Sequence, residues 1–326
     1  MLAALIALVA APTPISAYGG RVAWSAPIGG GRFALMTHTA GGTVRVPVAP
    51  RRVPFDVDLG PTAGGHVAAV YTRCRRDPPP SGAGGTPALY ERGRGCDVFE
   101  YDFATGRERL VAEASSPVAS ESWPAIWRTR LAFERTYDAH RRAPLLYIRT
   151  LGSRAPSRRL PTGPRRGCAG TGAGARYCGD PLLSRATGLD LRGRRLAFSW
   201  TYGGPTEGLE TEIRIDTLGA RPRLVARQHG GGLSHPVLEA PALDGAHVLW
   251  AMSCWGDPGG CLHRTALFRA PLAGGRITRV AQRPWIQTIA AGGGALYVLR
   301  DPTGTGMCED DPPAGPRCRL ETAAPF

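Results

Sequence analysis

Cysteine is the residue type with the clearest chemistry in this 326-residue sequence, which contains eight of them. They fall as neighbours along the chain: Cys74 and Cys96, Cys168 and Cys178, Cys254 and Cys261, and Cys308 and Cys318. An even number of cysteines in an exported chain predicts disulfide bonds. Zinc is the alternative, because Cys254, Cys261 and His263 could act as ligands, but their spacing is not that of a zinc ribbon or finger. We therefore expect four bridges between neighbours and no metal at these cysteines.

Acidic side chains are a second set of candidates. Together with one tryptophan and one glutamine, they lie in short segments that precede the most apolar runs of the chain. The set is Asp56, Asp58, Trp123, Asp190, Glu239 and Gln287. Carboxylates that converge can bind a cation such as calcium and support hydrolysis. The alternative is that they line a water-filled channel, whose walls are polar whether or not anything binds.

Other motifs give little support for catalysis. The sequence has no Gly-x-Ser-x-Gly elbow, no His-Glu-x-x-His helix and no phosphate-binding loop. The acidic group Glu309, Asp310 and Asp311 could contact calcium, but three adjacent acids more often form a solvated loop tip. We predict no catalytic residue and no resident cofactor, with weak calcium binding as the alternative.

Six short apolar runs recur along the chain and must form the framework of any site. They cover residues 20–25, 66–71, 130–134, 195–200, 247–252 and 295–299. Their spacing of roughly 45 to 65 residues is close to the period of propeller blades once insertions are allowed for. Each run follows a short segment that ends in a tight turn, and precedes an alternating strand and then a more polar strand.

The polarity within each unit predicts how the units assemble. The apolar run suits a strand covered on both faces, and the polar last strand suits an exposed outer edge. We predict an all-β fold, a six-bladed β-propeller of four-stranded antiparallel blades, as a single domain over residues 18–326. A large β-sandwich is the alternative. The first unit is expected to begin at its second strand and the last to end in its third. The sequence therefore does not determine which strand closes the ring.

The predicted chain direction places the cysteines on one face. The connection between second and third strands and the connection to the next blade leave an antiparallel blade at the same end, and the cysteines lie there. Holding a long loop such as 75–95 in one shape costs entropy, and a short bridge would restrain it by about 2 to 3.5 kcal/mol. We expect a face of disulfide-braced loops. Trp255, within the loop 255–260, is the candidate exposed contact, with packing against a neighbouring loop as its alternative.

The repeats resemble those of TolB-like propeller proteins, whose unit has a proline, an apolar residue, Ser-Pro-Asp-Gly and then an apolar strand. Pro241-Ala-Leu-Asp-Gly245 before the run at 247, and Pro124-Ala-Ile-Trp127 before the run at 130, match part of this pattern. The resemblance implies a six-bladed β-propeller with a binding role, and it names no partner.

Charge alone does not indicate a nucleic-acid partner. The formal net charge is +14, and all 40 basic residues are arginine. We attribute this bias to a genome rich in G and C. The arginines are dispersed in short doublets rather than in long runs, which favours a solvated surface over a nucleic-acid interface. Weak attraction to an anionic envelope polymer or lipid surface stays open.

The N-terminus is typical of an export signal. Met1–Ala11 is apolar but too short to span a bilayer, and Ile15, Ser16 and Ala17 provide a small-residue cleavage site. We expect residues 1–17 to be a signal peptide cleaved near Ala17, and a secreted, periplasmic or envelope location without a transmembrane segment. The alternative is a buried first strand.

Two functions follow from this sequence. The first is an exported, monomeric binding or scaffold module that uses the braced face and the channel mouth for a protein or an envelope glycan. The alternative is a metal-assisted, lactonase-like hydrolase with its site in the central channel.

Overall fold

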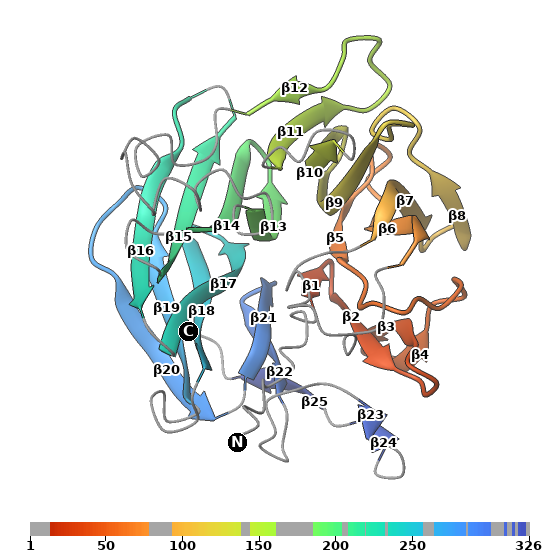
Figure 1. The fold of residues 1–326 in the computed structure, drawn as a ribbon. Helices are drawn as coiled ribbons and strands as arrows, with labels where there is room; N and C mark the ends of the chain where they lie inside the picture. Colours follow the sequence, from red (N-terminus) through yellow and green to blue (C-terminus); the bar gives the residue numbers. More distant parts are fainter. Residues whose placement is uncertain are drawn as a thin grey trace, which may run out of the picture.

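A computed structural model of the chain describes residues 14–77, 93–137, 144–160, 185–203, 208–218, 220–231, 234–256, 264–284, 286–300, 310–311, 315–316 and 319–323. These residues form a six-bladed β-propeller (Figure 1), which confirms the predicted fold. In each blade, antiparallel strands follow one another from the axis of the ring to its rim.

The first three blades each have four strands. Blade 1 contains β1 (Ile15–Tyr18), β2 (Arg21–Pro27), β3 (Phe33–Thr39) and β4 (Gly42–Arg45). Blade 2 contains β5 (Asp58–Pro61), β6 (Val67–Arg76), β7 (Arg94–Asp102) and β8 (Arg107–Leu110). Blade 3 contains β9 (Ala119–Trp127), β10 (Arg130–Tyr137), β11 (Leu145–Thr150) and β12 (Arg158–Arg159).

The remaining blades complete the ring. Blade 4 contains β13 (Arg185–Arg192), β14 (Arg195–Gly203), β15 (Gly208–Thr217) and β16 (Arg223–Gly231). Blade 5 contains β17 (Ser234–Asp244), β18 (His247–Gly256), β19 (Arg264–Pro271) and β20 (Thr278–Pro284). Blade 6 contains β21 (Ile286–Gly292), β22 (Ala295–Arg300) and β25 (Arg319–Ala323), and β23 (Asp310–Asp311) pairs with β24 (Gly315–Pro316) beside it.

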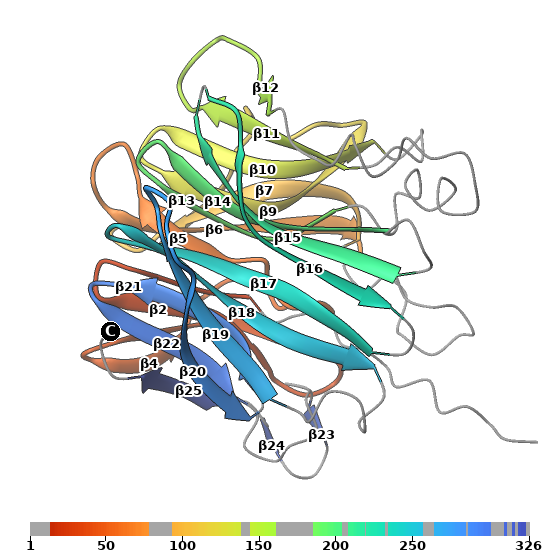
Figure 2. The ribbon, with the colours of Figure 1, turned by 90° about the vertical axis from the view of Figure 1, so that its left-hand side faces the viewer.

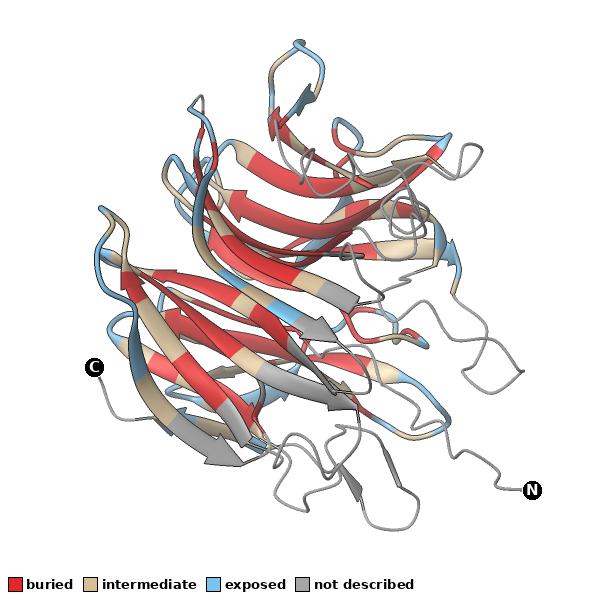
Figure 3. Cartoon of the chain, turned by 60° about the vertical axis from the view of Figure 1, so that its left-hand side comes forward, coloured by how far each residue is buried: buried red, intermediate tan, exposed pale blue. Residues whose placement is uncertain are grey.

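The six apolar runs of the sequence are the second strands of the six blades, as predicted. In β6, Ala68 to Tyr71 are fully buried, because the strand is covered by both neighbouring blades. The outer strands β4 and β8 are largely exposed. Figure 3 shows this gradient, with buried residues concentrated in the inner strands and exposed ones at the rim and in the turns.

The prediction that the first unit begins at its second strand is wrong. β1 precedes β2 and pairs with it along its full length, from Ile15 opposite Trp24 to Tyr18 opposite Arg21. Gly19 and Gly20 join the two strands with φ of 60° and 74°, the conformation of a two-residue hairpin turn that only glycine adopts without cost. Ile15, Ser16 and Ala17 therefore form a buried inner strand, and cleavage after Ala17 would remove most of it.

Packing between blades supplies the core. The buried apolar side chains form six clusters, one at each blade interface. The cluster that closes the ring joins Ala17 and Val22 of blade 1 to Ala290 and Leu299 of blade 6. Side-chain packing thus joins the last blade to the first. Between blades 2 and 3 the backbones also meet closely on the axis side, where a Cβ added to Gly60 would lie 2.1 Å from the Ile126 carbonyl oxygen.

The two faces of the ring differ in their connections. The connections from first to second strands are short, as at 19–20, 128–129 and 245–246, and all leave by one face, the short-turn face. The connections from second to third strands include 77–93 and 301–318 and leave by the other, the long-connection face. Figure 2 shows the ring from the side, with the short turns together on the left.

One predicted disulfide lies among the described residues. Cys74 of β6 and Cys96 of β7 face each other in register and are bonded, at the long-connection end of blade 2. The other three predicted pairs each include a cysteine outside the described residues, so those bridges stay predictions. No helix in the part of the chain that the structure describes is long and apolar enough to cross a membrane.

Candidate functional site

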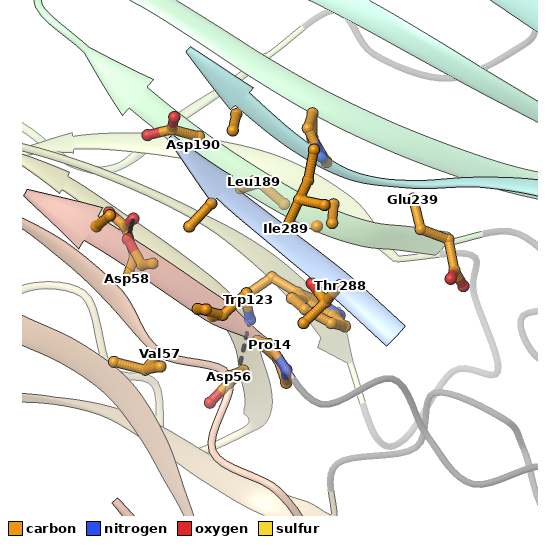
Figure 4. A pocket seen from close by; sticks show the side chains of 18 of the residues that line it. Pro14, Asp56, Val57, Asp58, Trp123, Leu189, Asp190, Glu239, Thr288 and Ile289 are labelled. Atoms are coloured by element: carbon orange, nitrogen blue, oxygen red, sulfur yellow. Dashed lines mark hydrogen bonds between the residues drawn. The ribbon is translucent and has the colours of Figure 1, made fainter. Parts of the chain in front are cut away.

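The innermost strands of the six blades enclose a cavity of about 40 Å³ on the axis of the ring. Its walls contain five of the six side chains predicted to line a channel, Asp56, Asp58, Trp123, Asp190 and Glu239. Figure 4 shows that they do not gather at one point. Asp58 and Asp190 lie towards one end, Asp56 and Trp123 lie further along the cavity, and Glu239 stands apart. Gln287 belongs to β21, but its side chain lies outside the described part of the chain.

Arg192 of β13 crosses the channel at the short-turn end. Its guanidinium donates to the carbonyl oxygens of Ala17 (2.8 Å) and Leu59 (3.1 Å), which belong to blades 1 and 2. It also lies over the rings of Tyr18 and Trp127, with centroid distances of 5.2 and 5.8 Å. One side chain from blade 4 therefore contacts three other blades at this end of the channel.

Two buried carboxylates lie beside Arg192. Asp190 Oδ1 is 3.3 Å from the Arg192 Nε, and Asp58 faces the same guanidinium from blade 2. Burial, followed by the charge of Asp190, raises the pKa of Asp58 to about 7. Burial also raises the pKa of Asp190, and Arg192 opposes this shift. A single arginine thus compensates two acids, which makes this end of the channel sensitive to pH near neutrality.

Asp56 links blade 2 to blade 3. Its Oδ2 accepts a hydrogen bond from the backbone N–H of Trp123 at 2.9 Å, and its Oδ1 accepts one from the N–H of Thr72 at 2.8 Å. The Thr72 hydroxyl donates to the same carboxylate. Arg51, buried as well, lies 3.8 Å away. The oxygens of Asp56 are therefore engaged by groups of its own protein.

The same arrangement recurs around the ring. Asp58 Oδ2 accepts from Ile126 N–H (2.9 Å), and Asp190 Oδ2 accepts from Leu243 N–H (2.6 Å). In each case, an acid on one blade satisfies a backbone donor on the innermost strand of the next. Side-chain oxygens of Ser16, Glu134 and Thr211 accept in the same way from the backbone N–H groups of Leu59, Ala186 and Leu238 on the next blade. These six side chains, Asp56 included, are thus tethers between blades, since a buried N–H without an acceptor is costly.

This arrangement gives little room for a metal ion. Among the described residues, no group of three or more histidine, cysteine, aspartate or glutamate side chains could hold one. Calcium needs several oxygens that converge, whereas Asp56, Asp58 and Asp190 each turn towards a backbone donor. The geometry therefore favours a structural role for these acids over a catalytic one.

The innermost strands lose regular pairing at a common level along the channel. The register shifts in β9, β13, β17 and β21, at the positions of Trp123, Thr187, Ala240 and Gln287. Trp123 and Ala240 have φ of 51° and 49°, a region that residues other than glycine rarely occupy. Bulges re-aim side chains and occur often beside functional sites. Blades 3, 4 and 5 therefore present irregular backbone to the cavity, at Trp123, Thr187 and Ala240.

The predicted contact Trp255 lies elsewhere than expected. β18 extends to Gly256, and Trp255 pairs with His235 of β17, so it belongs to a strand and not to the loop 255–260. The reason is the length of β17, which gives β18 a partner beyond the apolar run. Trp255 lies at the long-connection end of blade 5, and its side chain is outside the described part of the structure.

Sequence reasoning missed Arg192 and Ser16. Arg192 is one of 40 arginines, and nothing in its neighbours marks it as the one that reaches across the axis. Ser16 falls in a stretch with the composition of a cleavage site. Its only available signal was the Gly19-Gly20 pair between two apolar segments, which is typical of a hairpin.

Comparison with known proteins assigns this chain to no family. Scans against protein-family models and against curated proteins found no match. Among solved structures, TolB from Acinetobacter baumannii is 12% identical with a TM-score of 0.44, over 80% of this chain and 53% of that one. The chain thus spans about half the length of that protein.

Two further structures have similar scores. The SapL1 lectin in complex with alpha methyl fucoside is 10% identical with a TM-score of 0.49, over 90% of this chain and 89% of that one. Oligogalacturonate lyase in complex with manganese is 13% identical with a TM-score of 0.46, over 94% and 74%.

Proposed function

We propose that this protein is a binding module that takes its ligand at the channel mouth on the long-connection face. The observation that carries the proposal is the register break shared by four neighbouring inner strands, with Trp123 and Ala240 held at positive φ. Such strain is kept where surrounding structure and function require it. Arg192 bonds to blades 1 and 2 at the opposite end, which favours approach of a ligand from the long-connection face.

The size of the cavity limits what enters it. About 40 Å³ is enough for about three water molecules, and therefore for one small group of a larger ligand. The rest of the ligand would lie across the long connections. A protein or an envelope glycan, the partners expected from the sequence, both suit this arrangement.

Export is part of the same proposal. The Cys74–Cys96 bond supports an oxidising compartment, because disulfides are rare in reducing ones. The place of β1 supports a leader whose removal leaves Ile15 to Tyr18 in the mature chain, so we propose a cleavage point before Ile15 rather than after Ala17.

Binding assays with matched variants test the proposal. The immobilised protein is challenged with a glycan array and with detergent-solubilised envelope proteins, and each bound species is then titrated against Glu239→Gln and Trp255→Ala. Arg107→Gln, an exposed residue at the rim, is the control. We expect Glu239→Gln, in the cavity wall, and Trp255→Ala, at the long-connection end of blade 5, to weaken binding at least tenfold with unchanged Tm. Equal binding by all variants, or no bound species, would contradict the proposal.

The metal-assisted hydrolase of the sequence analysis is tested in parallel. Elemental analysis of the purified protein and lactone hydrolysis with and without a chelator decide it. Stoichiometric calcium or zinc with chelator-sensitive turnover would replace the binding proposal with the hydrolase.

A further inference from the structure

A second cavity lies between blades 3 and 4, on the short-turn face and away from the channel mouth. Its volume is about 430 Å³. Arg130, Arg158, Arg194 and Thr150 line it, and Ile148 and Leu218 form an apolar wall. The residues come from strand ends and turns of two adjacent blades, so the blade interface itself holds them in place.

The guanidinium groups of two of these arginines are held in position. Arg130 Nη1 donates to the Gly193 carbonyl oxygen at 3.2 Å, and Arg194 Nη2 donates to the Leu218 carbonyl oxygen at 3.0 Å. Neutral carbonyl acceptors fix these side chains without cancelling their charge. Within the part of the chain that the structure describes, none of the three arginines forms a salt bridge.

One carboxylate lies near the cavity. Asp216 lies on β15, two residues before Leu218, which packs against blade 3, and Asp216 is close enough to Arg158 of blade 3 to feel its charge. Asp216 is fully buried, and among the described residues its oxygens have no hydrogen-bond partner. Burial raises its pKa, and Arg158 is the charge that opposes this shift. Whether Asp216 is protonated or not, three arginines against one acid leave the cavity positive.

We propose that this cavity binds a small organic phosphate monoester. Arginine binds phosphate with paired hydrogen bonds, and three arginines around one cavity match the charge of a dianion. The volume lies in the range of small-molecule pockets, and the wall of Ile148 and Leu218 suits an apolar body attached to the phosphate. The monoester is either a free metabolite or the headgroup of a lipid such as phosphatidic acid.

Calorimetric titration of the whole protein tests the proposal with phenyl phosphate as probe, and with inorganic phosphate and benzyl alcohol as its two halves. We expect saturable binding of phenyl phosphate at one site, tighter than either half. Arg158→Gln should weaken it about tenfold or more, because charged hydrogen bonds are lost. Arg158 is exposed in β12, so this variant is expected to fold, and Arg107→Gln at the rim of blade 2 is the control for general charge.

Vesicle sedimentation distinguishes the two sources of phosphate. Vesicles of phosphatidylcholine with and without phosphatidic acid are compared for wild type, Arg158→Gln and Arg107→Gln. Binding to phosphatidic acid that only Arg158→Gln reduces supports the site with a lipid headgroup. Phenyl phosphate binding without vesicle binding supports it with a free ester. If neither probe binds saturably, or if both variants behave alike, the proposal is wrong.

Discussion

Replacing Asp56 with alanine separates its two possible roles. If Asp56 is a tether, the change leaves the N–H groups of Thr72 and Trp123 without an acceptor in a buried place. At about 2 kcal/mol for each orphaned group, with a smaller term for the Thr72 hydroxyl, the unfolding free energy should fall by about 5 kcal/mol. The loss of a partner for buried Arg51 adds to this. For a domain of this size the Tm should fall by at least about 10 °C.

Differential scanning calorimetry measures this effect, with two reference variants. Asp56→Asn keeps one acceptor oxygen, so its Tm should lie between those of wild type and Asp56→Ala. Asp102→Ala removes an aspartate whose Oδ1 accepts from the exposed Ala104 N–H and whose Oδ2 lies 3.8 Å from Nδ1 of the exposed His66, so its effect should be small. A Tm of Asp56→Ala within about 2 °C of wild type, together with lost ligand or metal binding, would refute the tether and restore the binding-site hypothesis.

Three further predictions concern the short-turn end of the channel and the first strand. Arg192→Met should lower the unfolding free energy by about 3 to 5 kcal/mol, because it leaves buried Asp190 without its charged partner. Denaturant unfolding measures this loss, with Arg195→Met at an exposed position as the control. The pKa of Asp58 is raised to about 7, mainly by burial, so the folded chain holds a proton that the unfolded chain loses near pH 4. The stability that this proton contributes is complete below about pH 4 and is lost as the pH rises to about 7. Asp58→Asn should therefore become more stable relative to wild type between about pH 5 and pH 8. A difference in stability that stays constant over this range would contradict the assignment. A chain that begins at Tyr18 should melt at least about 5 °C below one that begins at Pro12, because it lacks Ser16 and its bonds to Asp58 and Leu59; equal Tm values would show that β1 is dispensable.

The architecture was predictable because it depends on local pattern. Continuous apolar runs such as 66–71 identify strands buried on both faces, and the run at 247–252 repeats the pattern. Six copies then determine the number of blades, since each needs a neighbour on both sides. β1 escaped because four residues are too few for a pattern, and because small residues serve equally well in a cleavage site and where blades approach closely.

The role of the channel acids was not predictable in the same way. The sequence correctly places Asp56, Asp58 and Asp190 on the axis. It does not tell whether their oxygens face the cavity or a neighbouring blade, because the donors lie 67, 68 and 53 residues further along the chain, at Trp123, Ile126 and Leu243. Only the closed ring brings these groups together.

The way the ring closes explains why these acids suit structure better than catalysis. Blade 6 meets blade 1 through side-chain packing. The innermost strands have no partner strand on the side that faces the axis. Bonds between neighbouring blades near the axis therefore come from side chains such as Ser16. An acid that turned from its backbone donor to bind a metal ion would leave a buried N–H without an acceptor, at a cost of about 1 to 3 kcal/mol. A metal site in this channel would have to repay that cost at each acid, whereas the proposed ligand at the mouth would contact the bulged backbone and leave every tether intact.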